Sequence, residues 1–315
     1  LAGHARVAVL DGGFAGWRAL DLPLEAEAPP PPALPPYPVA FDRARLFDAA
    51  RVQAHLDAGG LLLDARGGER FRGESEPIDA RAGHVPGAVN FPWHTAFVDT
   101  VTRDVVPPER FTELAQEAGI DKDSTVVLYG DSNNWFAAWG AWVFTLYGHD
   151  DVRLVDGGRG AWESEGRELE LAAPTPARGT FEAAQADPAL RAFLPEVVEV
   201  ATGDREATLV DIRGAAEFNG EIFAPEGVQE LSIRAGHVPG AVNVPWVEAV
   251  DEDGKFKSVE ELRALYAEAG VDGSAPIITY CRIGERASHT WFVLNKILGY
   301  DAKLYDGSWT EYGNA

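Results

Sequence analysis

Residues 275–291 read APIITYCRIGERASHTW and hold the only cysteine of the 315-residue chain. The apolar run before Cys281 predicts a buried strand, and the helical spacing of apolar residues from Trp291 to Leu298 predicts a helix. We therefore expect Cys281 on a short loop between the carboxyl end of a strand and the start of a helix. Open α/β sheets bind their ligands at that edge.

The loop that follows Cys281 combines residue types that favour a reactive thiolate. Unpaired N–H groups at the start of a helix favour a negative charge, and the thiolate is the nucleophilic form of cysteine. Gly284 allows the backbone to turn its N–H groups inward, while Arg282 and Arg286 can pair with an anionic substrate. The sequence thus predicts a positively charged cup around one sulfur. The simpler alternative, a small buried apolar cysteine, requires neither the glycine nor the arginines.

Composition narrows the possible partners and the setting. The chain carries 27 basic and 50 acidic residues, for a formal net charge of −23, so we expect neither nucleic acid nor a membrane surface as a partner. A single cysteine excludes an intramolecular disulfide and indicates a reducing, cytoplasmic setting. We expect no metal site and no cofactor. Because the chain has no Met, we interpret it as a fragment.

The chain contains an internal repeat. The block AGHVPGAVNFPW at residues 82–93 returns as AGHVPGAVNVPW at residues 235–246. Upstream of each block, an apolar strand ends in Asp-x-Arg, at residues 64–66 and 211–213. Downstream, each copy closes with a strand, an Asp-Gly turn and a tryptophan, and this closing pattern occurs a third time at residues 1–17.

Strands alternate with helical patterns in both repeats, which is typical of a parallel sheet with helices on both faces. The predicted fold class is therefore α/β, with two such domains. Residues 217–234 have the character of an inserted loop that covers one rim of the site. We expect an orphan domain end, a proline-rich linker, an inactive domain, a second linker and a catalytic domain at residues 1–28, 29–39, 40–171, 172–187 and 188–315.

The first repeat lacks a nucleophile. Where the second repeat has Cys281, the first has Gly130, and the next residue is Asp131. We expect this half to be catalytically silent and to serve as a packing partner and a wall of the cleft. The tryptophans are interpreted mainly as core residues, with Trp93 or Trp246 as candidates for lining the cleft between the domains.

Together these motifs resemble those of the tandem-domain rhodaneses. The loop CRIGER at residues 281–286, the ending at residues 307–313, the Asp-x-Arg strands and the Gly-His-Val-Pro-Gly-Ala turns are similar to those of two-domain thiosulfate sulfurtransferases. This resemblance covers roughly residues 95–315, whereas residues 1–95 look more like the middle of a 3-mercaptopyruvate sulfurtransferase. It implies two rhodanese-like domains, each a parallel sheet flanked by helices, of which only the second is catalytic.

The resemblance also implies a ping-pong transfer of sulfur. Cys281 would attack the outer sulfur of thiosulfate, become a persulfide and release sulfite. Cyanide in vitro, or a thiol in the cell, would then accept the sulfur. The family's substrate-binding arginine corresponds to Arg286, and Arg282 would support the bound anion electrostatically.

Five further residues are expected to shape the site. Ile283, Gly284 and Glu285 form the rest of the active-site loop, whose N–H groups would hold the persulfide. Glu285 is also expected to lock the loop by pairing with an arginine. Asp211 and Arg213 are expected to orient the loop from beneath.

Several alternatives stay open at this point. A 3-mercaptopyruvate sulfurtransferase is disfavoured because its loop is uncharged in the family, and because Glu217 stands where that family has its carboxylate-binding arginine. A non-enzymatic rhodanese-like sulfur carrier or binding module is a further alternative. A cysteine phosphatase is a third alternative. It is disfavoured because the spacing from Cys281 to Arg286 is one residue shorter than in the C-x5-R loop of those enzymes, and the smaller ring of N–H groups suits one sulfur better than a phosphate. A protease-like pair of Cys281 with His289 lacks an evident third residue.

Overall fold

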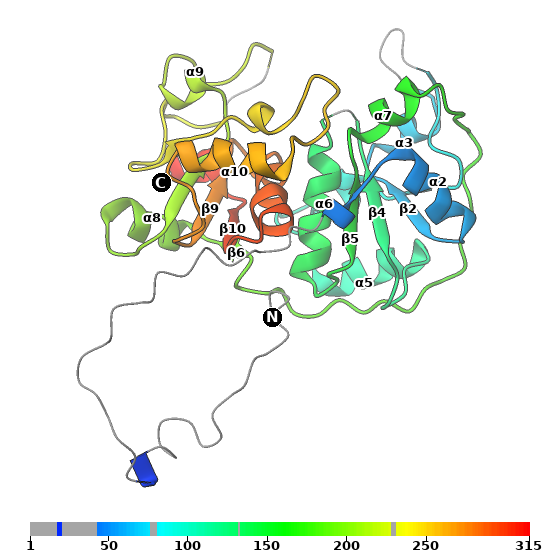
Figure 1. Cartoon of the computed structure of the whole chain (residues 1–315), viewed down its shortest axis with the longest axis horizontal. Helices are drawn as coiled ribbons and strands as arrows, with labels where there is room; N and C mark the ends of the chain where they lie inside the picture. Colours follow the sequence, from blue (N-terminus) through cyan, green and yellow to red (C-terminus); the bar gives the residue numbers. More distant parts are fainter. Residues whose placement is uncertain (1–17, 21–42, 76–80, 132, 228–230) are drawn as a thin grey trace. The chain divides into compact units, whose positions relative to one another are not determined.

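The computed structural model describes residues 18–20, 43–75, 81–131, 133–227 and 231–315. The predicted orphan domain end and the proline-rich linker therefore lie outside the described residues, apart from residues 18–20. Residues 42–315 form one unit, and this unit consists of two lobes that lie side by side (Figure 1).

The first lobe is built on a five-stranded parallel sheet with the order β1-β5-β4-β2-β3. Its strands are β1 (Leu46–Phe47), β2 (Leu61–Asp64), β3 (Val89–Asn90), β4 (Val126–Tyr129) and β5 (Val152–Val155). Its helices are η1 (Arg43–Arg45), α2 (Ala49–Asp57), α3 (Gly68–Phe71), α4 (Trp93–Ala96), α5 (Pro108–Glu117), α6 (Trp135–Leu146) and α7 (Gly158–Ser164). The continuous buried apolar run of β4 is what a parallel strand covered on both faces requires.

The second lobe repeats this topology with the order β6-β10-β9-β7-β8. Its strands are β6 (Arg191–Ala192), β7 (Thr208–Asp211), β8 (Val242–Asn243), β9 (Ile277–Tyr280) and β10 (Ala302–Tyr305). Its helices are α8 (Leu194–Thr202), α9 (Ala215–Phe218), η2 (Trp246–Ala249), α10 (Val259–Glu268), α11 (Ala287–Trp291), η3 (Phe292–Ile297) and α12 (Ser308–Tyr312). The two parallel sheets flanked by helices confirm the predicted α/β fold with two repeated domains.

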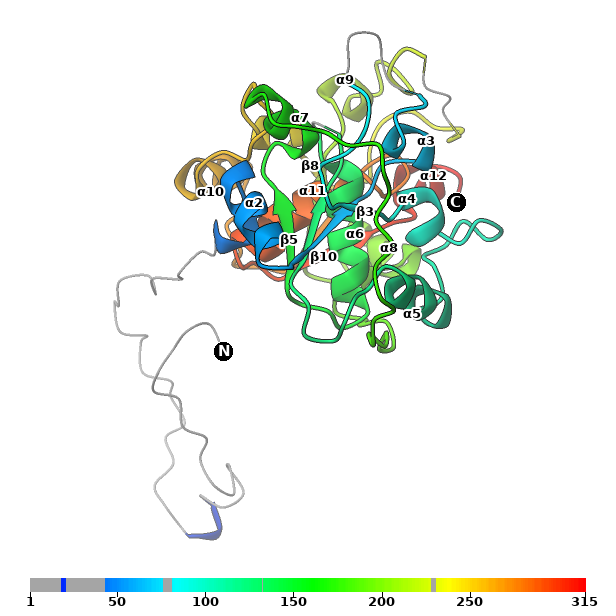
Figure 2. The same cartoon turned by 90° about the vertical axis from the view of Figure 1, so that its right-hand side faces the viewer.

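Helix α6 joins the two lobes. Every residue from Ala137 to Leu146 is buried, and a helix that is apolar on all sides must be covered on all sides. It packs on β4 and β5 of its own lobe and on α11 and η3 of the other. Figure 1 shows it between the two sheets, and Figure 2 shows it near the middle of the unit. The first lobe therefore reaches the cysteine loop through the start of α6.

Two equivalent aspartates also connect the lobes. Asp156 and Asp306 each follow the last strand of their sheet, in the repeated Asp-Gly turn. The Asp156 carboxylate accepts the backbone N–H of Phe256 from the second lobe at 2.9 Å. The Asp306 carboxylate accepts two hydrogen bonds from Arg191, at 2.9 and 2.6 Å, and Arg191 also contacts Asp104 of the first lobe at 2.5 Å. The turn beneath the catalytic loop is thus tied to the first lobe.

The predicted second linker packs against the first lobe. Residues 172–187 run along the first lobe, where Phe181 is buried and donates its N–H to the Ile120 carbonyl at 3.0 Å.

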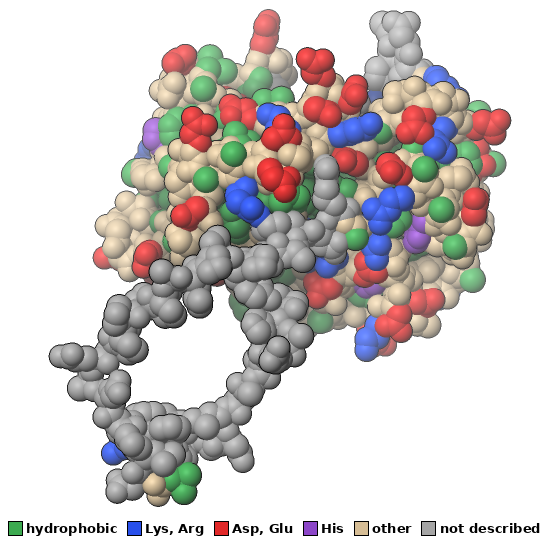
Figure 3. Space-filling view, viewed as in Figure 1, with side chains coloured by type: hydrophobic (Ala, Val, Ile, Leu, Met, Phe, Trp, Pro, Cys, Tyr) green, Lys and Arg blue, Asp and Glu red, His purple; other side chains and the backbone are tan. Residues whose placement is uncertain are grey.

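Acidic side chains are spread over both lobes with Lys and Arg between them (Figure 3). Within the described ranges, no helix combines the length and the apolar character needed to cross a membrane.

Candidate active site

The cysteine lies where the sequence predicts it. Strand β9 ends at Tyr280, the loop spans residues 281–286, and α11 begins at Ala287. The predicted helix is confirmed at its start, but its second half, Phe292–Ile297, has the wider π-helical turn. The loop lies at the carboxyl edge of the sheet, as expected for a ligand site in an α/β fold.

Hydrogen bonds hold both the sulfur and the backbone of Cys281. The Gly284 N–H points at Sγ, with 3.2 Å between N and S. The Cys281 N–H donates to Ser308 Oγ at 3.0 Å, and the Cys281 carbonyl accepts the N–H of Trp309 at 3.1 Å. Cys281 is fully buried, and its backbone is held by the first two residues of α12.

Gly284 is required by the shape of this loop. Its φ is +102°, a conformation that side chains other than glycine rarely adopt. A Cβ at this position would collide with the carbonyl oxygen of Asp306. The loop is thus pressed against the Asp-Gly turn that follows β10, and this contact aims the Gly284 N–H at the sulfur.

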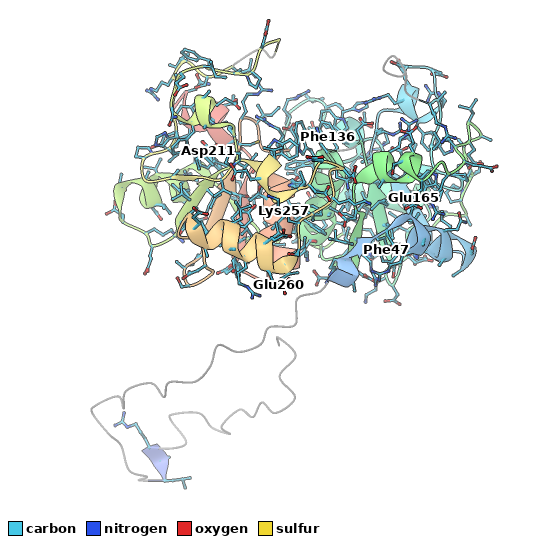
Figure 4. The ribbon with its side chains drawn as sticks, turned by 45° about the horizontal axis from the view of Figure 1, so that its top comes forward. Phe47, Phe136, Glu165, Asp211, Lys257 and Glu260 are labelled. Atoms are coloured by element: carbon cyan, nitrogen blue, oxygen red, sulfur yellow. The ribbon has the colours of Figure 1, made fainter. Side chains whose placement is uncertain are left out.

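A pocket of about 320 Å³ opens beside the loop. Its lining residues come from both lobes and from the inserted loop, and they are Trp93, Trp135, Phe136, Pro225, Arg282, Ile283, Glu285 and Arg286. Figure 4 shows Phe136 where the two lobes meet. Cys281 itself is not among the described lining residues, but its loop neighbours Arg282 and Ile283 are. Pro225 places the inserted loop at the rim, as expected, and Trp93, but not Trp246, lines the pocket.

Arg286 is held by residues from both lobes. Its guanidinium lies over the ring of Trp135, the first residue of α6, at 5.6 Å from the ring centroid. Its Nη2 is 3.8 Å from Oε1 of Glu217 in α9. Trp135 is itself fixed by an edge-to-face contact with Trp246 at 4.8 Å, and its carbonyl accepts the Ser288 hydroxyl at 3.3 Å. The sequence predicted only Trp93 or Trp246 as tryptophans of the cleft, so the role of Trp135 was missed.

Glu285 is the titratable group of the pocket. Burial raises the pKa of Glu285 to about 7, against the opposing effect of the Arg282, Arg103 and Arg286 guanidinium groups. Arg103 belongs to the first lobe, so charges from both lobes act on this carboxyl. With this pKa, the carboxyl of Glu285, and with it the pocket, gains negative charge as the pH rises through neutrality.

Asp211 and Arg213 form a buried ion pair beside the repeated turn. Arg213 Nη2 lies 2.7 Å from Asp211 Oδ2 and donates to the Gly236 carbonyl at 2.6 Å. In the next part of the same turn, the Val238 N–H donates to the Tyr280 hydroxyl at 3.1 Å. The pair therefore contacts the turn directly and reaches the cysteine loop through Tyr280, the last residue of β9. Figure 4 shows Asp211 in the second lobe.

The corresponding loop of the first lobe is built differently. The buried pair recurs, with Arg66 Nη2 at 2.7 Å from Asp64 Oδ2. Gly130 stands at the cysteine position, and the next residue, Asp131, forms an ion pair with Arg70 of α3. Because the Asp-Arg pair occurs in both lobes, it belongs to the fold, whereas the cysteine loop belongs to the second lobe alone.

His289 has the character of a core residue. Burial lowers its pKa to about 3, so the ring is neutral at pH 7. It stacks on Phe256 at 4.6 Å, and its Nδ1 has no hydrogen-bond partner in the described part of the chain. Among the described residues, no group of three or more His, Cys, Asp or Glu side chains could hold a metal ion.

Comparison with known proteins defines the class. The family model of the rhodanese-like domain matches residues 48–165 and 194–315, one match in each lobe. The chain therefore belongs to the rhodanese family, as the motifs suggested, and fold, site and relatives together define a sulfurtransferase of that family.

Individual relatives refine this picture. A protein of Saccharopolyspora erythraea named as a putative thiosulfate sulfurtransferase is 52% identical over 234 residues, 74% of this chain and 82% of that protein. The sulfur carrier protein TtuD of Thermus thermophilus is 48% identical over 236 residues, 74% of this chain and 83% of TtuD. The crystal structure of SseA from Escherichia coli, described as a 3-mercaptopyruvate sulfotransferase, superposes with a TM-score of 0.69 at 29% identity and covers 84% of this chain and 98% of that chain.

Proposed function

We propose that this protein is a thiosulfate sulfurtransferase that carries the sulfane sulfur as a persulfide on Cys281. The observation that carries the proposal is the Gly284 N–H aimed at Sγ at 3.2 Å, in a loop whose Arg282 and Arg286 line the adjoining pocket. An N–H donor favours a thiolate over a thiol, and two guanidinium groups favour a dianionic donor.

The first half-reaction forms the persulfide. The Cys281 thiolate attacks the outer sulfur of thiosulfate, a new S–S bond forms, and the S–S bond of thiosulfate breaks. Sulfite leaves with the electron pair of the broken bond. Arg286 and Arg282 bind the sulfonate oxygens, and this attraction strengthens as negative charge collects on the departing sulfite.

The second half-reaction transfers the sulfur from Cys281 to an acceptor. A thiophilic acceptor attacks the outer sulfur of the persulfide, and the Cys281 thiolate leaves with the electron pair. With cyanide the product is thiocyanate, and with a cellular thiol it is a new persulfide. The loop of Ile283, Gly284 and Glu285 holds the intermediate, while Asp211 and Arg213 support it through the neighbouring turn. This chemistry fits a reducing, cytoplasmic setting, in which a free thiol persists.

Donor specificity follows from the loop charge. Thiosulfate presents its anionic oxygens directly next to the sulfur that is attacked, so arginines of the cysteine loop can bind them. In 3-mercaptopyruvate the carboxylate is further from the sulfur, and Glu217 places a negative charge in the second lobe near Arg286. We expect kcat/KM for thiosulfate to exceed that for 3-mercaptopyruvate by at least about tenfold with cyanide as acceptor. The reverse order would make the protein a mercaptopyruvate sulfurtransferase.

A sulfur-carrier role is the second candidate. The full burial of Cys281 favours it, because an enclosed persulfide is shielded from solvent reductants, and TtuD is named as a sulfur carrier. The two roles differ in the fate of the persulfide. A sulfurtransferase acting on small molecules releases its sulfur to cyanide and to small thiols within its catalytic cycle. A carrier retains the sulfur in the presence of millimolar small thiols and releases it only to a protein acceptor.

A further inference from the structure

Glu217 is a buried carboxylate near the cysteine loop, and the sulfur-transfer steps above give it no role. It occupies the third position of α9, and its Oε2 accepts the Gly214 N–H at 3.2 Å, which caps the helix. Its other oxygen, Oε1, is buried and has no hydrogen-bond partner in the described chain. Arg286 faces this oxygen, with Nη2 at 3.8 Å from Oε1, and the Glu217 side chain is only 4% exposed. A buried carboxylate with one oxygen unpaired is costly unless a cation compensates its charge.

The first lobe contains an equivalent ion pair with the charges reversed. The third residue of α3 is Arg70, which corresponds to Glu217 in α9. Arg70 forms an ion pair with Asp131, in the loop that corresponds to the cysteine loop. In each lobe, the third residue of the short helix after the Asp-x-Arg strand therefore carries the charge that opposes the loop. In the silent lobe the loop is acidic and the helix basic, and in the catalytic lobe the loop is basic and the helix acidic.

We propose that Glu217 is a positioning residue that holds Arg286 in the orientation that binds the anionic sulfur donor. The proposal rests on the sulfurtransferase function proposed above. Glu217 attracts the guanidinium within a largely buried environment, where the attraction is weakly screened. The guanidinium also lies over the face of the Trp135 ring, so two contacts restrain it where Arg286 lines the pocket.

Glu217→Gln separates the helix-capping role of this side chain from the attraction of its charge for Arg286. Glutamine at the third position of a helix can still accept the Gly214 N–H, so the cap is retained while the charge is lost. In a ping-pong cycle, kcat/KM for thiosulfate reports the first half-reaction and kcat/KM for cyanide reports the second. We expect kcat/KM for thiosulfate to fall about 10- to 100-fold, as for other misplaced binding groups, with little change in kcat/KM for cyanide.

Two further variants complete the test. Glu217→Asp keeps the charge on a shorter side chain and should retain an intermediate kcat/KM for thiosulfate, which also keeps the test decisive if the glutamine variant folds poorly. Arg70→Gln removes the equivalent ion pair in the silent lobe and should leave both constants unchanged. A parallel fall of both constants in Glu217→Gln would indicate a merely structural role and would overturn the inference.

The outcome for the wild-type protein separates this inference from the proposed function. If the wild type forms no persulfide with thiosulfate, the proposed function is wrong. If the wild type forms it and both Glu217 variants keep the wild-type kcat/KM for thiosulfate, the function stands and the positioning role is wrong.

Discussion

The backbone N–H of Gly284 points at Sγ of Cys281, with 3.2 Å between the two atoms. This contact exists because Gly284 adopts φ +102°, and Asp306 leaves no room for a side chain there. The same N–H can stabilise the thiolate before attack and the inner sulfur of the persulfide afterwards. The reactivity of Cys281 is therefore built into the backbone of its loop.

Gly284→Ala tests this directly. The new Cβ must displace the Asp306 backbone, so we expect a loss of about 2–4 kcal/mol in the free energy of unfolding and a fall in persulfide formation of at least about 100-fold. Gly203→Ala is the matched control, because Gly203 has φ +83° and a methyl group added there would meet nothing within 4 Å. It should cost about 1 kcal/mol with unchanged activity. Equal activity losses in both variants would contradict the role of the loop.

Trp135 carries the contribution of the silent lobe to the active site. Trp135→Ala removes the ring beneath the Arg286 guanidinium, and we expect the KM for thiosulfate to rise about tenfold, with Trp135→Phe restoring part of the affinity. Steady-state kinetics at varied thiosulfate measures this. Trp162→Phe, in the core of the first lobe, should lower stability without changing KM, and an unchanged KM in Trp135→Ala would exclude the cross-lobe contact as a binding element.

Glu285 makes stability depend on pH. Burial raises its pKa from an ordinary 4.5 to about 7, so between these values the folded chain keeps a proton that the unfolded chain has lost. Stability therefore falls as the pH rises through this window. Glu285→Gln should be more stable than the wild type by on the order of 1–3 kcal/mol at pH 8, and equally stable near pH 4.5. Urea unfolding at both pH values measures this, and a difference that does not change with pH would refute the assignment.

Arg191 neutralises the buried carboxylate beside the catalytic loop. In Arg191→Met, Asp306 loses both hydrogen bonds from the guanidinium, and we expect a loss of about 3 kcal/mol at pH 8. Burial already raises the pKa of Asp306, so the loss should shrink at pH 5, where the carboxyl is more easily protonated. Arg153→Met removes a more exposed pair with Asp151 and should cost less than about 1 kcal/mol. Equal losses in both variants would contradict this.

Local features of the sequence predict much of the fold. The apolar run that becomes β9 and the glycine-containing loop after Cys281 placed the cysteine between strand and helix, because these signals act over a few residues. The repeated blocks predicted two similar domains, and the two sheets share one strand order.

Contacts between distant segments could not be predicted in the same way. The pairing of Glu217 with Arg286 depends on how α9 faces the loop, and the role of Trp135 depends on how the lobes dock through α6. Likewise, the full burial of Cys281 and the hydrogen bond from its N–H to Ser308 of α12 follow from tertiary packing, which the sequence did not predict.

The most direct test is the intact mass of the protein after incubation with thiosulfate and again after addition of cyanide, for the wild type and for Cys281→Ser. We predict that the wild type gains the mass of one sulfur atom, that cyanide removes it as thiocyanate, and that the serine variant gains nothing. A wild type that gains no sulfur, or a serine variant that gains it equally, would contradict the assignment of Cys281 as the sulfur-carrying nucleophile.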